Sequence, residues 1–171
     1  MQNHFELFNL PAGFALDAAA LDSAYRDVQG RVHPDKFVNA TDAEKRVAMQ
    51  WATRANEAYN VLKNPFRRAA YLCELHGVDL QTESNTSMPR DFLMQQMEWR
   101  EELDDAKAAK SPDALESLQR TVRTARQSEI AGTGDLLDAG DYATAALNVR
   151  KLMFLEKFNA EIGDAFALIE A

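Results

Sequence analysis

The sequence RVHPDKF, residues 31–37, joins two segments in which apolar residues recur at the spacing of amphipathic helices. Proline disfavours helix in the residue before it, so the first helix is expected to end just before Pro34. His33-Pro34-Asp35 is therefore predicted at the tip of a helical hairpin, with the imidazole and the carboxylate facing water. An exposed tip of this kind suits recognition by another protein better than it suits catalysis.

Capping residues set the limits of the two helices beside this tip. Asp17 is a suitable N-cap for a helix over about 18–32, and its inward stripe is predicted to be Leu21, Tyr25, Val28 and Val32. Thr41 or Asp42 can cap a second helix that ends near Lys63. Its predicted inward positions include Val47, Trp51, Ala55, Ala58, Tyr59 and Leu62. Residues 3–9 form a short helix or turn, and 66–76 a further helix between Asn64-Pro65 and Gly77.

Three longer helical segments follow, over about 89–109, 112–138 and 142–170. Ser111-Pro112 supplies an N-cap and an N1 proline, and Gly140-Asp141 supplies a helix stop and the next cap. Gly132 and Gly134 are expected to interrupt the middle helix. Short connections between three helices favour an antiparallel bundle. We therefore predict an all-α protein with a domain over 1–76, a polar linker over 77–89 and a three-helix bundle over 90–171.

Composition narrows the classes of partner. The chain has 171 residues and a net charge of −8, and residues 81–171 carry 10 Lys and Arg against 17 Asp and Glu. This acidic balance argues against nucleic acid as a partner, because phosphate binding needs a basic face. No apolar run is long enough to cross a bilayer. Phe5 to Leu10 already has the pattern of folded structure, so we expect no targeting segment and a cytosolic location. Cys73, the single cysteine, is expected to be a small buried hydrophobe.

The first 75 residues resemble the J-domain of DnaJ-type co-chaperones. The matching motifs, in family order, are His33-Pro34-Asp35-Lys36, Ala55-Asn56-Glu57-Ala58-Tyr59-Asn60-Val61-Leu62, Asn64-Pro65 and Arg67-Arg68-Ala69-Ala70-Tyr71. The resemblance implies that the chain binds an ATP-loaded heat-shock chaperone ATPase and stimulates ATP hydrolysis in that partner. By position, the chaperone-binding residues would be His33, Pro34, Asp35, Lys36, Arg26 and Arg31. Asp22 and Asp27 make this helix less basic than in many J-domains.

Other interpretations of the tripeptide are an ordinary turn in a purely structural bundle, or a hydrolytic His-Asp pair. Histidine, proline and aspartate are common in turns, and a three-residue motif alone is weak. The flanking motifs favour the J-domain. A catalytic pair is disfavoured because no Ser or Cys stands nearby at the spacing of a nucleophile, so we expect no enzyme activity and no cofactor.

The helix predicted over 89–109 has apolar residues on two faces. With Phe92 at zero and 100° per residue, the stripe Phe92, Gln96, Trp99, Leu103 and Ala106 falls within about 40°. Leu93, Met94 and Met97 fall at roughly 100°, 200° and 140°. They lie among Glu98, Glu101, Asp104 and Asp105, with Arg100 at one margin. Either another helix covers these three apolar residues, or they form an acid-ringed docking patch.

Nearly the whole chain resembles HscB-type co-chaperones. The motifs are His33-Pro34-Asp35-Lys36-Phe37, Tyr71-Leu72 to Leu75-His76-Gly77, Phe92-Leu93-Met94 through Arg100-Glu101-Glu102-Leu103-Asp104, and Val149-Arg150-Lys151-Leu152 to Phe154-Leu155. This family links a J-domain to a three-helix bundle. It brings the iron–sulfur cluster scaffold protein IscU to a specialised chaperone ATPase, HscA. A general J-domain protein that delivers unfolded clients to a heat-shock chaperone is the alternative.

The resemblance also implies which residues bind the scaffold. By position they are Leu93, Met94, Met97, Glu98, Arg100, Glu101, Asp105 and Phe154. Met97 and Asp105 stand where a leucine and a glutamate are usual, and both exchanges keep the chemical character. The N-terminal metal-binding cysteines of some eukaryotic relatives are absent. His4, His33 and His76 are too scattered along the sequence to replace them, so we expect no metal site.

Overall fold

The computed structural model describes residues 2–80 and 88–171, and they divide into two compact units, Met1–Leu72 and Cys73–Ala171. All the regular structure in these residues is helical, which confirms the predicted all-α class. Within the described part of the chain, no helix is both long and apolar enough to span a membrane. The predicted domain limits of 1–76, 77–89 and 90–171 stay a prediction, and residues 81–87 of the expected linker lie outside the described residues.

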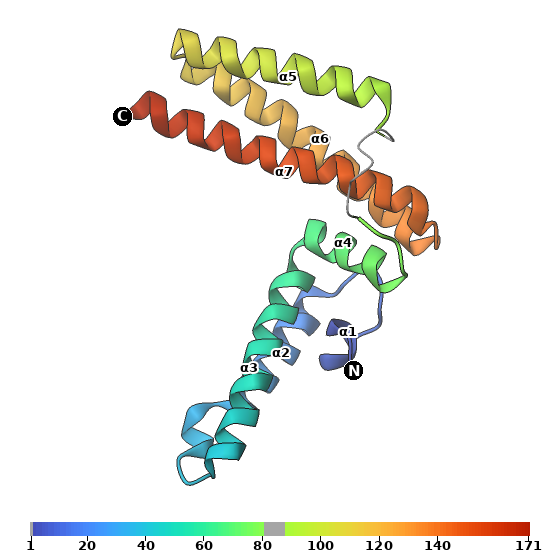
Figure 1. Ribbon diagram of the computed structural model, residues 1–171, viewed down its shortest axis with the longest axis vertical. Helices are drawn as coiled ribbons and strands as arrows, with labels where there is room; N and C mark the ends of the chain where they lie inside the picture. The colour runs from blue at the N-terminus through green and yellow to red at the C-terminus, as the bar shows by residue number, and fades with distance from the viewer. Residues whose placement is uncertain (1, 81–87) are drawn as a thin grey trace. The chain divides into compact units, whose positions relative to one another are not determined.

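The first unit is built on a hairpin of two helices, α2 (Ala18–Val32) and α3 (Asp42–Lys63) (Figure 1). The Asp17 side chain accepts hydrogen bonds from the backbone of Ala19 and Ala20, and that of Thr41 accepts one from Glu44, so both caps form as predicted. A short helix, α1 (His4–Leu7), packs on α3. The segment between α2 and α3 holds a single 3-10 turn, η1 (Pro34–Phe37).

The seam between α2 and α3 is lined by small residues and tyrosines. Leu62 and the alanines at 48, 55 and 58 are buried on α3. The rings of Tyr25 and Tyr59 stack with centroids 4.1 Å apart, and the Tyr59 hydroxyl donates to Asp22 at 2.7 Å. The inward stripe predicted for α3 was partly wrong, because Val47 and Trp51 are exposed.

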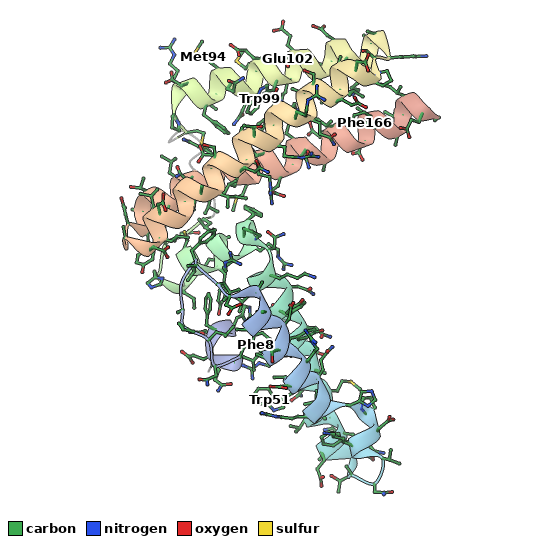
Figure 2. All side chains as sticks on the ribbon, turned by 180° about the vertical axis from the view of Figure 1, so that it is seen from behind. Phe8, Trp51, Met94, Trp99, Glu102 and Phe166 are labelled. Atoms are coloured by element: carbon green, nitrogen blue, oxygen red, sulfur yellow. The ribbon has the colours of Figure 1, made fainter. Side chains whose placement is uncertain are left out.

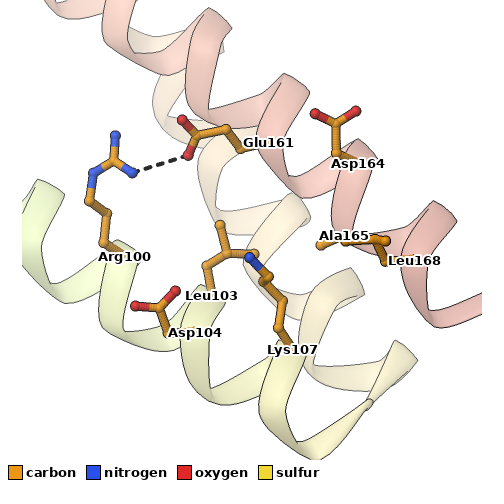
Figure 3. Close-up of a pocket in the computed structure, with 8 residues that line it drawn as sticks. All are labelled: Arg100, Leu103, Asp104, Lys107, Glu161, Asp164, Ala165 and Leu168. Atoms are coloured by element: carbon orange, nitrogen blue, oxygen red, sulfur yellow. Dashed lines mark hydrogen bonds and ion pairs between the residues drawn. The ribbon is translucent and has the colours of Figure 1, made fainter.

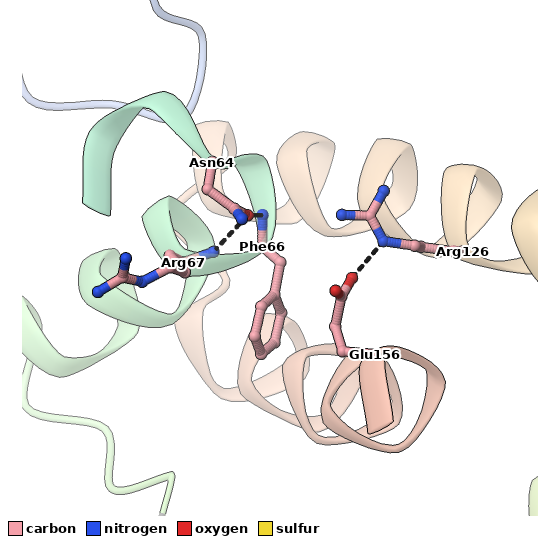
Figure 4. A network of polar contacts seen from close by, with 5 residues as sticks. All are labelled: Asn64, Phe66, Arg67, Arg126 and Glu156. Atoms are coloured by element: carbon pink, nitrogen blue, oxygen red, sulfur yellow. Dashed lines mark hydrogen bonds and ion pairs between the residues drawn. The ribbon is translucent and has the colours of Figure 1, made fainter. Parts of the chain in front are cut away.

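A fourth helix, α4 (Pro65–Leu75), begins where the sequence predicted. The Asn64 side chain accepts hydrogen bonds from the backbone N–H groups of Phe66 and Arg67, which start the helix (Figure 4). Beyond its end, Gly77 has a positive φ of 77°, a conformation that glycine adopts without strain.

The second unit contains three long helices, α5 (Arg90–Ala109), α6 (Pro112–Asp138) and α7 (Tyr142–Glu170). Ser111 and Asp141 cap α6 and α7, and Gly140 takes a φ of 79° in the turn between them, as predicted. The α6 helix runs without interruption through Gly132 and Gly134, contrary to expectation. Its burial against α7 outweighs the helix cost of the two glycines, about 1 kcal/mol each relative to Ala.

The bundle core is assembled mainly on α7. Eight residues of this helix are buried: Ala145, Ala146, Val149, Leu152, Leu155, Phe158, Ile162 and Ala165. Near the start of α7, the Tyr142 ring stacks on His76 with centroids 3.8 Å apart. Cys73 is fully buried, as expected, and desolvation raises the pKa of its thiol to about 11.

Candidate functional site

The first candidate site is the exposed tip of the α2–α3 hairpin. His33 has extended backbone dihedrals (φ −59°, ψ 137°), which ends α2 before Pro34. The His33 side chain then caps η1, because its Nδ1 accepts a hydrogen bond of 3.2 Å from the Asp35 N–H. The His33 carbonyl accepts a second bond, 2.9 Å long, from the Lys36 N–H. The turn is thus held by its own residues.

This hydrogen bonding fixes which face the two ionisable side chains present. Because Nδ1 accepts from the backbone, the neutral His33 ring carries its proton on Nε2, where it can act as a donor to a partner. The His33 Nδ1 atom lies 3.6 Å from a carboxylate oxygen of Asp35. This separation is a near contact, because that nitrogen has no proton to give. The Asp35 side chain is 89% exposed and its carboxylate is available as an acceptor.

The cations proposed to accompany the tip are also exposed. Arg26 and Arg31 lie on α2, and Lys36 lies in η1. Asp22, one of the two acids on α2, accepts the Tyr59 hydroxyl bond and so belongs to the seam between the helices. The acidic character that the sequence assigned to this helix therefore comes partly from a structural carboxylate.

An apolar groove that the sequence did not predict lies beside the tip. It has a volume of about 450 Å³ and is lined by Val32, Pro34, Phe37, Val38, Lys45, Ala48, Met49 and Ala52. Val38 and Met49 in this groove are 67% and 70% exposed. Helical spacing could have predicted that Met49 is exposed. Ala48, Ala55 and Leu62 are seven residues apart and lie on the buried face of α3, and Met49, the next residue after Ala48, points away from that face.

The second candidate site is the outer face of α5. The exposed fractions of Leu93, Met94 and Met97 are 42%, 54% and 71%. Figure 2 shows Met94 on the outer side of α5 and Trp99 on the side that faces the other helices of the bundle. The interpretation that another helix covers these three residues is therefore wrong, and their role as a docking patch stays a prediction. Glu98, Glu101 and Asp105 are exposed on the same helix.

An aromatic cluster supports this face from below. Phe154 of α7 lies edge-on to Phe92 at 5.7 Å between centroids, and it stacks on Trp99 and Phe158 at 6.4 and 5.4 Å. Phe154 is half-buried, so only part of its ring reaches the surface. Contacts on three sides fix its orientation. The patch therefore rests on a rigid base.

Arg100 has a structural partner that the sequence did not reveal. One of its terminal nitrogens lies 3.1 Å from a carboxylate oxygen of Glu161, and the guanidinium carbon lies 5.6 Å from the Phe154 ring centroid. Figure 3 shows this ion pair crossing from α5 to α7 at one end of a cleft of about 260 Å³. Arg100 thus forms an ion pair with Glu161, and its guanidinium lies over the Phe154 and Phe158 rings of the aromatic cluster.

Neither site has the features of a metal centre. Among residues 2–80 and 88–171, no group of three or more His, Cys, Asp or Glu side chains is placed to hold an ion. The pKa of His4 is lowered, chiefly by desolvation. His4 stacks on Tyr71, with 4.3 Å between their ring centroids, in the first unit.

Comparison with known proteins gives one consistent result. Residues 88–163 match the family described as the HSCB C-terminal oligomerisation domain. A curated co-chaperone protein HscB homolog of Burkholderia mallei (strain SAVP1) is 55% identical over 168 residues, covering 98% of this chain and 96% of that protein. A homolog from Burkholderia thailandensis is 56% identical over the same length.

Solved structures agree with the curated relatives. The chaperone HscB from Vibrio cholerae superposes with a TM-score of 0.85 at 36% identity, covering 98% of this chain and 99% of that one. The human co-chaperone protein HscB superposes with a TM-score of 0.88 at 26% identity, covering 95% and 81%. In both, the likeness extends over both units of the chain.

Proposed function

The chain belongs to the HscB family of co-chaperones, and from this premise we propose that it is an adaptor between two protein partners. One partner is a specialised heat-shock chaperone ATPase of the HscA type, which would engage the hairpin tip. The other is an iron–sulfur cluster scaffold protein of the IscU type, which would bind the outer face of α5. The adaptor works in the cytosol and carries out no chemistry of its own.

The observation that supports this proposal is that each unit exposes one candidate binding surface. The tip presents an exposed acceptor on Asp35 and a donor on His33. The α5 face presents three exposed apolar side chains next to carboxylates. A protein with two such surfaces can bind two partners at once, which raises the effective concentration of the scaffold protein near the ATPase. Aid to cluster assembly follows from delivering the scaffold to the ATPase.

The tip can act on an ATPase through one charged contact. The Asp35 carboxylate would accept a charge-assisted hydrogen bond from a cation of the chaperone, roughly twice as strong as a neutral one. Pro34 and the two short-range hydrogen bonds of His33 fix the turn before binding, which lowers the entropy lost on association. Arg26, Arg31 and Lys36 would steer the tip toward an acidic surface. Hydrolysis itself uses the residues of the chaperone.

The patch fits a folded partner better than an unfolded client. A general J-domain protein would need a broad apolar surface, whereas Leu93, Met94 and Met97 form a small one bordered by Glu98 and Glu101. Methionine adapts its shape to a partner, and the surrounding acids select a partner with basic residues. The general J-domain function is therefore the second candidate.

The steady-state ATPase rate of the cognate chaperone tests the proposal. We expect this protein to raise the rate, and the scaffold protein to raise it further when both are present. Stimulation that does not respond to the scaffold would contradict the assignment of α5. No stimulation at any concentration would contradict the proposed role of the tip.

A further inference from the structure

A groove on the second unit continues the α5 face onto α7. It has a volume of about 350 Å³, and its walls include Leu93 and Gln96 from α5 and Arg150, Met153, Phe154 and Lys157 from α7. Leu93 and Phe154 also belong to the patch proposed for the scaffold. The groove and the patch are therefore one continuous surface, in which Arg150, Met153 and Lys157 of α7 have no assigned role.

Ion pairing leaves a positive charge on the α7 side of the groove. Lys151 pairs with Glu129 at 3.5 Å, and Glu156 pairs with Arg126 (Figure 4). Among the residues that the structure describes, Lys157 makes no ion pair and its side chain is exposed.

Arg150 adds to this charge without a strong partner. One terminal nitrogen donates a long hydrogen bond of 3.5 Å to the Asp79 carbonyl, and the buried Nε has no acceptor. A guanidinium in this position has donors to spare, because it carries five N–H groups. A carboxylate brought into the groove could accept hydrogen bonds from the terminal N–H groups of Arg150.

The charges change sign across the apolar centre. On α5, Leu93 lies at the edge nearest α7, and Met97 lies roughly 40° further round the helix. Glu101 and Asp105 lie roughly 80° and 120° beyond Leu93 on the same side. The surface therefore runs from two cations on α7, through apolar side chains, to carboxylates on α5.

We propose that this groove receives a carboxylate-bearing apolar segment of the same scaffold partner, which fixes the partner in one orientation. The acidic edge of the partner lies over Arg150 and Lys157, and its basic edge lies over Glu101 and Asp105. Opposite charges at the two ends reject the reversed pose, because like charges would then face each other. This inference rests on the proposed binding of the scaffold to α5.

Charge reversal of Lys157 tests the inference through the sign of its effect. If the partner met this protein only through basic residues, a Lys157→Glu change would strengthen binding by adding negative charge. The proposed polarity instead predicts that affinity for the purified, metal-free scaffold falls by about tenfold, with a larger loss at low salt. Lys157→Gln should fall between the wild type and Lys157→Glu. Titration calorimetry at two salt concentrations measures each affinity.

Arg123→Glu is the matched control, because Arg123 is exposed on α6, away from the groove, and the change in net charge is the same. It should leave the affinity within about twofold. Equal or tighter binding by Lys157→Glu, relative to this control, would overturn the inference while leaving the scaffold assignment intact. Absence of binding by the wild-type chain would overturn both. Circular dichroism of each variant verifies that the helices are retained.

Discussion

The hairpin tip and the α5 face present binding groups in opposite ways. At the tip, a short turn exposes whole residues, and its shape depends on hydrogen bonds between neighbours in sequence. On α5, a regular helix exposes only side-chain ends, and its position depends on an aromatic cluster contributed by residues about 60 positions apart in sequence. We therefore expect that one or two residues supply most of the binding free energy at the tip, whereas on α5 it is spread over several side chains.

The largest effect should come from Asp35→Asn, which removes the charge of the tip without changing its size. Stimulation of the chaperone ATPase should be lost, because the charge-assisted bond cannot form. Affinity for the scaffold should stay within about twofold, since the change is far from α5 in sequence and lies on the other unit. Asp27→Asn, an exposed acid of α2, is the control and should keep stimulation. Loss of both ATPase stimulation and scaffold binding in Asp35→Asn would contradict the assignment of the two functions to separate surfaces.

Phe158→Ala should most strongly destabilise the base of the α5 face. Phe158 is fully buried between Trp99 and Phe154, and removal of such a side chain costs about 3–5 kcal/mol. Hydrogen exchange should show the loss in amides of α5, α6 and α7. Phe166→Ala, at a half-buried position near the end of the same helix (Figure 2), should cost less. An equal cost for the two changes would contradict the role given to the cluster.

Joint replacement of Leu93 and Met97 by Ala tests whether exposed side chains of α5 supply binding energy. Scaffold affinity should fall by about 1–3 kcal/mol, the scale of interface hot spots, with little change in the free energy of unfolding. Met49→Ala is a close control, because Met49 and Met97 are 70% and 71% exposed. It should leave scaffold affinity unaltered. Unfolding of the bundle by the double change would show that these residues belong to the core.

The smallest effect concerns the pH dependence of the first unit. Burial lowers the folded-state pKa of His4 below its ordinary value of 6.5, so the unfolded chain binds the proton more readily. Stability should therefore fall as pH drops from about 6.5 through the folded-state pKa, and level off below it. His4→Gln should flatten this part of the curve. Thermal unfolding between pH 7.5 and 5 measures the slope, and a slope retained by His4→Gln would exclude His4 as its source.

Helix limits were predictable because local chemistry sets them. Asp17, Thr41, Ser111 and Asp141 each cap the helix that the sequence assigned to them. Hydrophobicity did not predict which face of α3 is buried. The small side chain of Ala48 lies in the seam between α2 and α3, whereas the larger Val47 is exposed. The predicted interruption of α6 at Gly132 and Gly134 was wrong for a similar reason, since packing of α6 on α7 overrides local helix propensity.

The candidate sites also combine features that the sequence predicted with features that depend on tertiary contacts. The position of His33-Pro34-Asp35 followed from proline geometry. Helical angles placed Leu93, Met94 and Met97 off the core stripe but did not decide whether another helix covers them. The pairing of Arg100 with Glu161 joins residues 61 positions apart, and no spacing rule reports such a contact. The groove with Arg150 and Lys157 is formed by residues of two helices that are more than 50 positions apart in sequence. Tertiary partners therefore account for what the sequence left out.

The buried Cys73 bears on how a protein of this kind handles metal-bearing cargo. With a pKa of about 11, the thiol is ionised in about one molecule in ten thousand at pH 7, and iron is bound by thiolates rather than thiols. It is also the only cysteine of the chain. Under the proposed function, Cys73 would therefore not ligate a cluster carried by the scaffold protein.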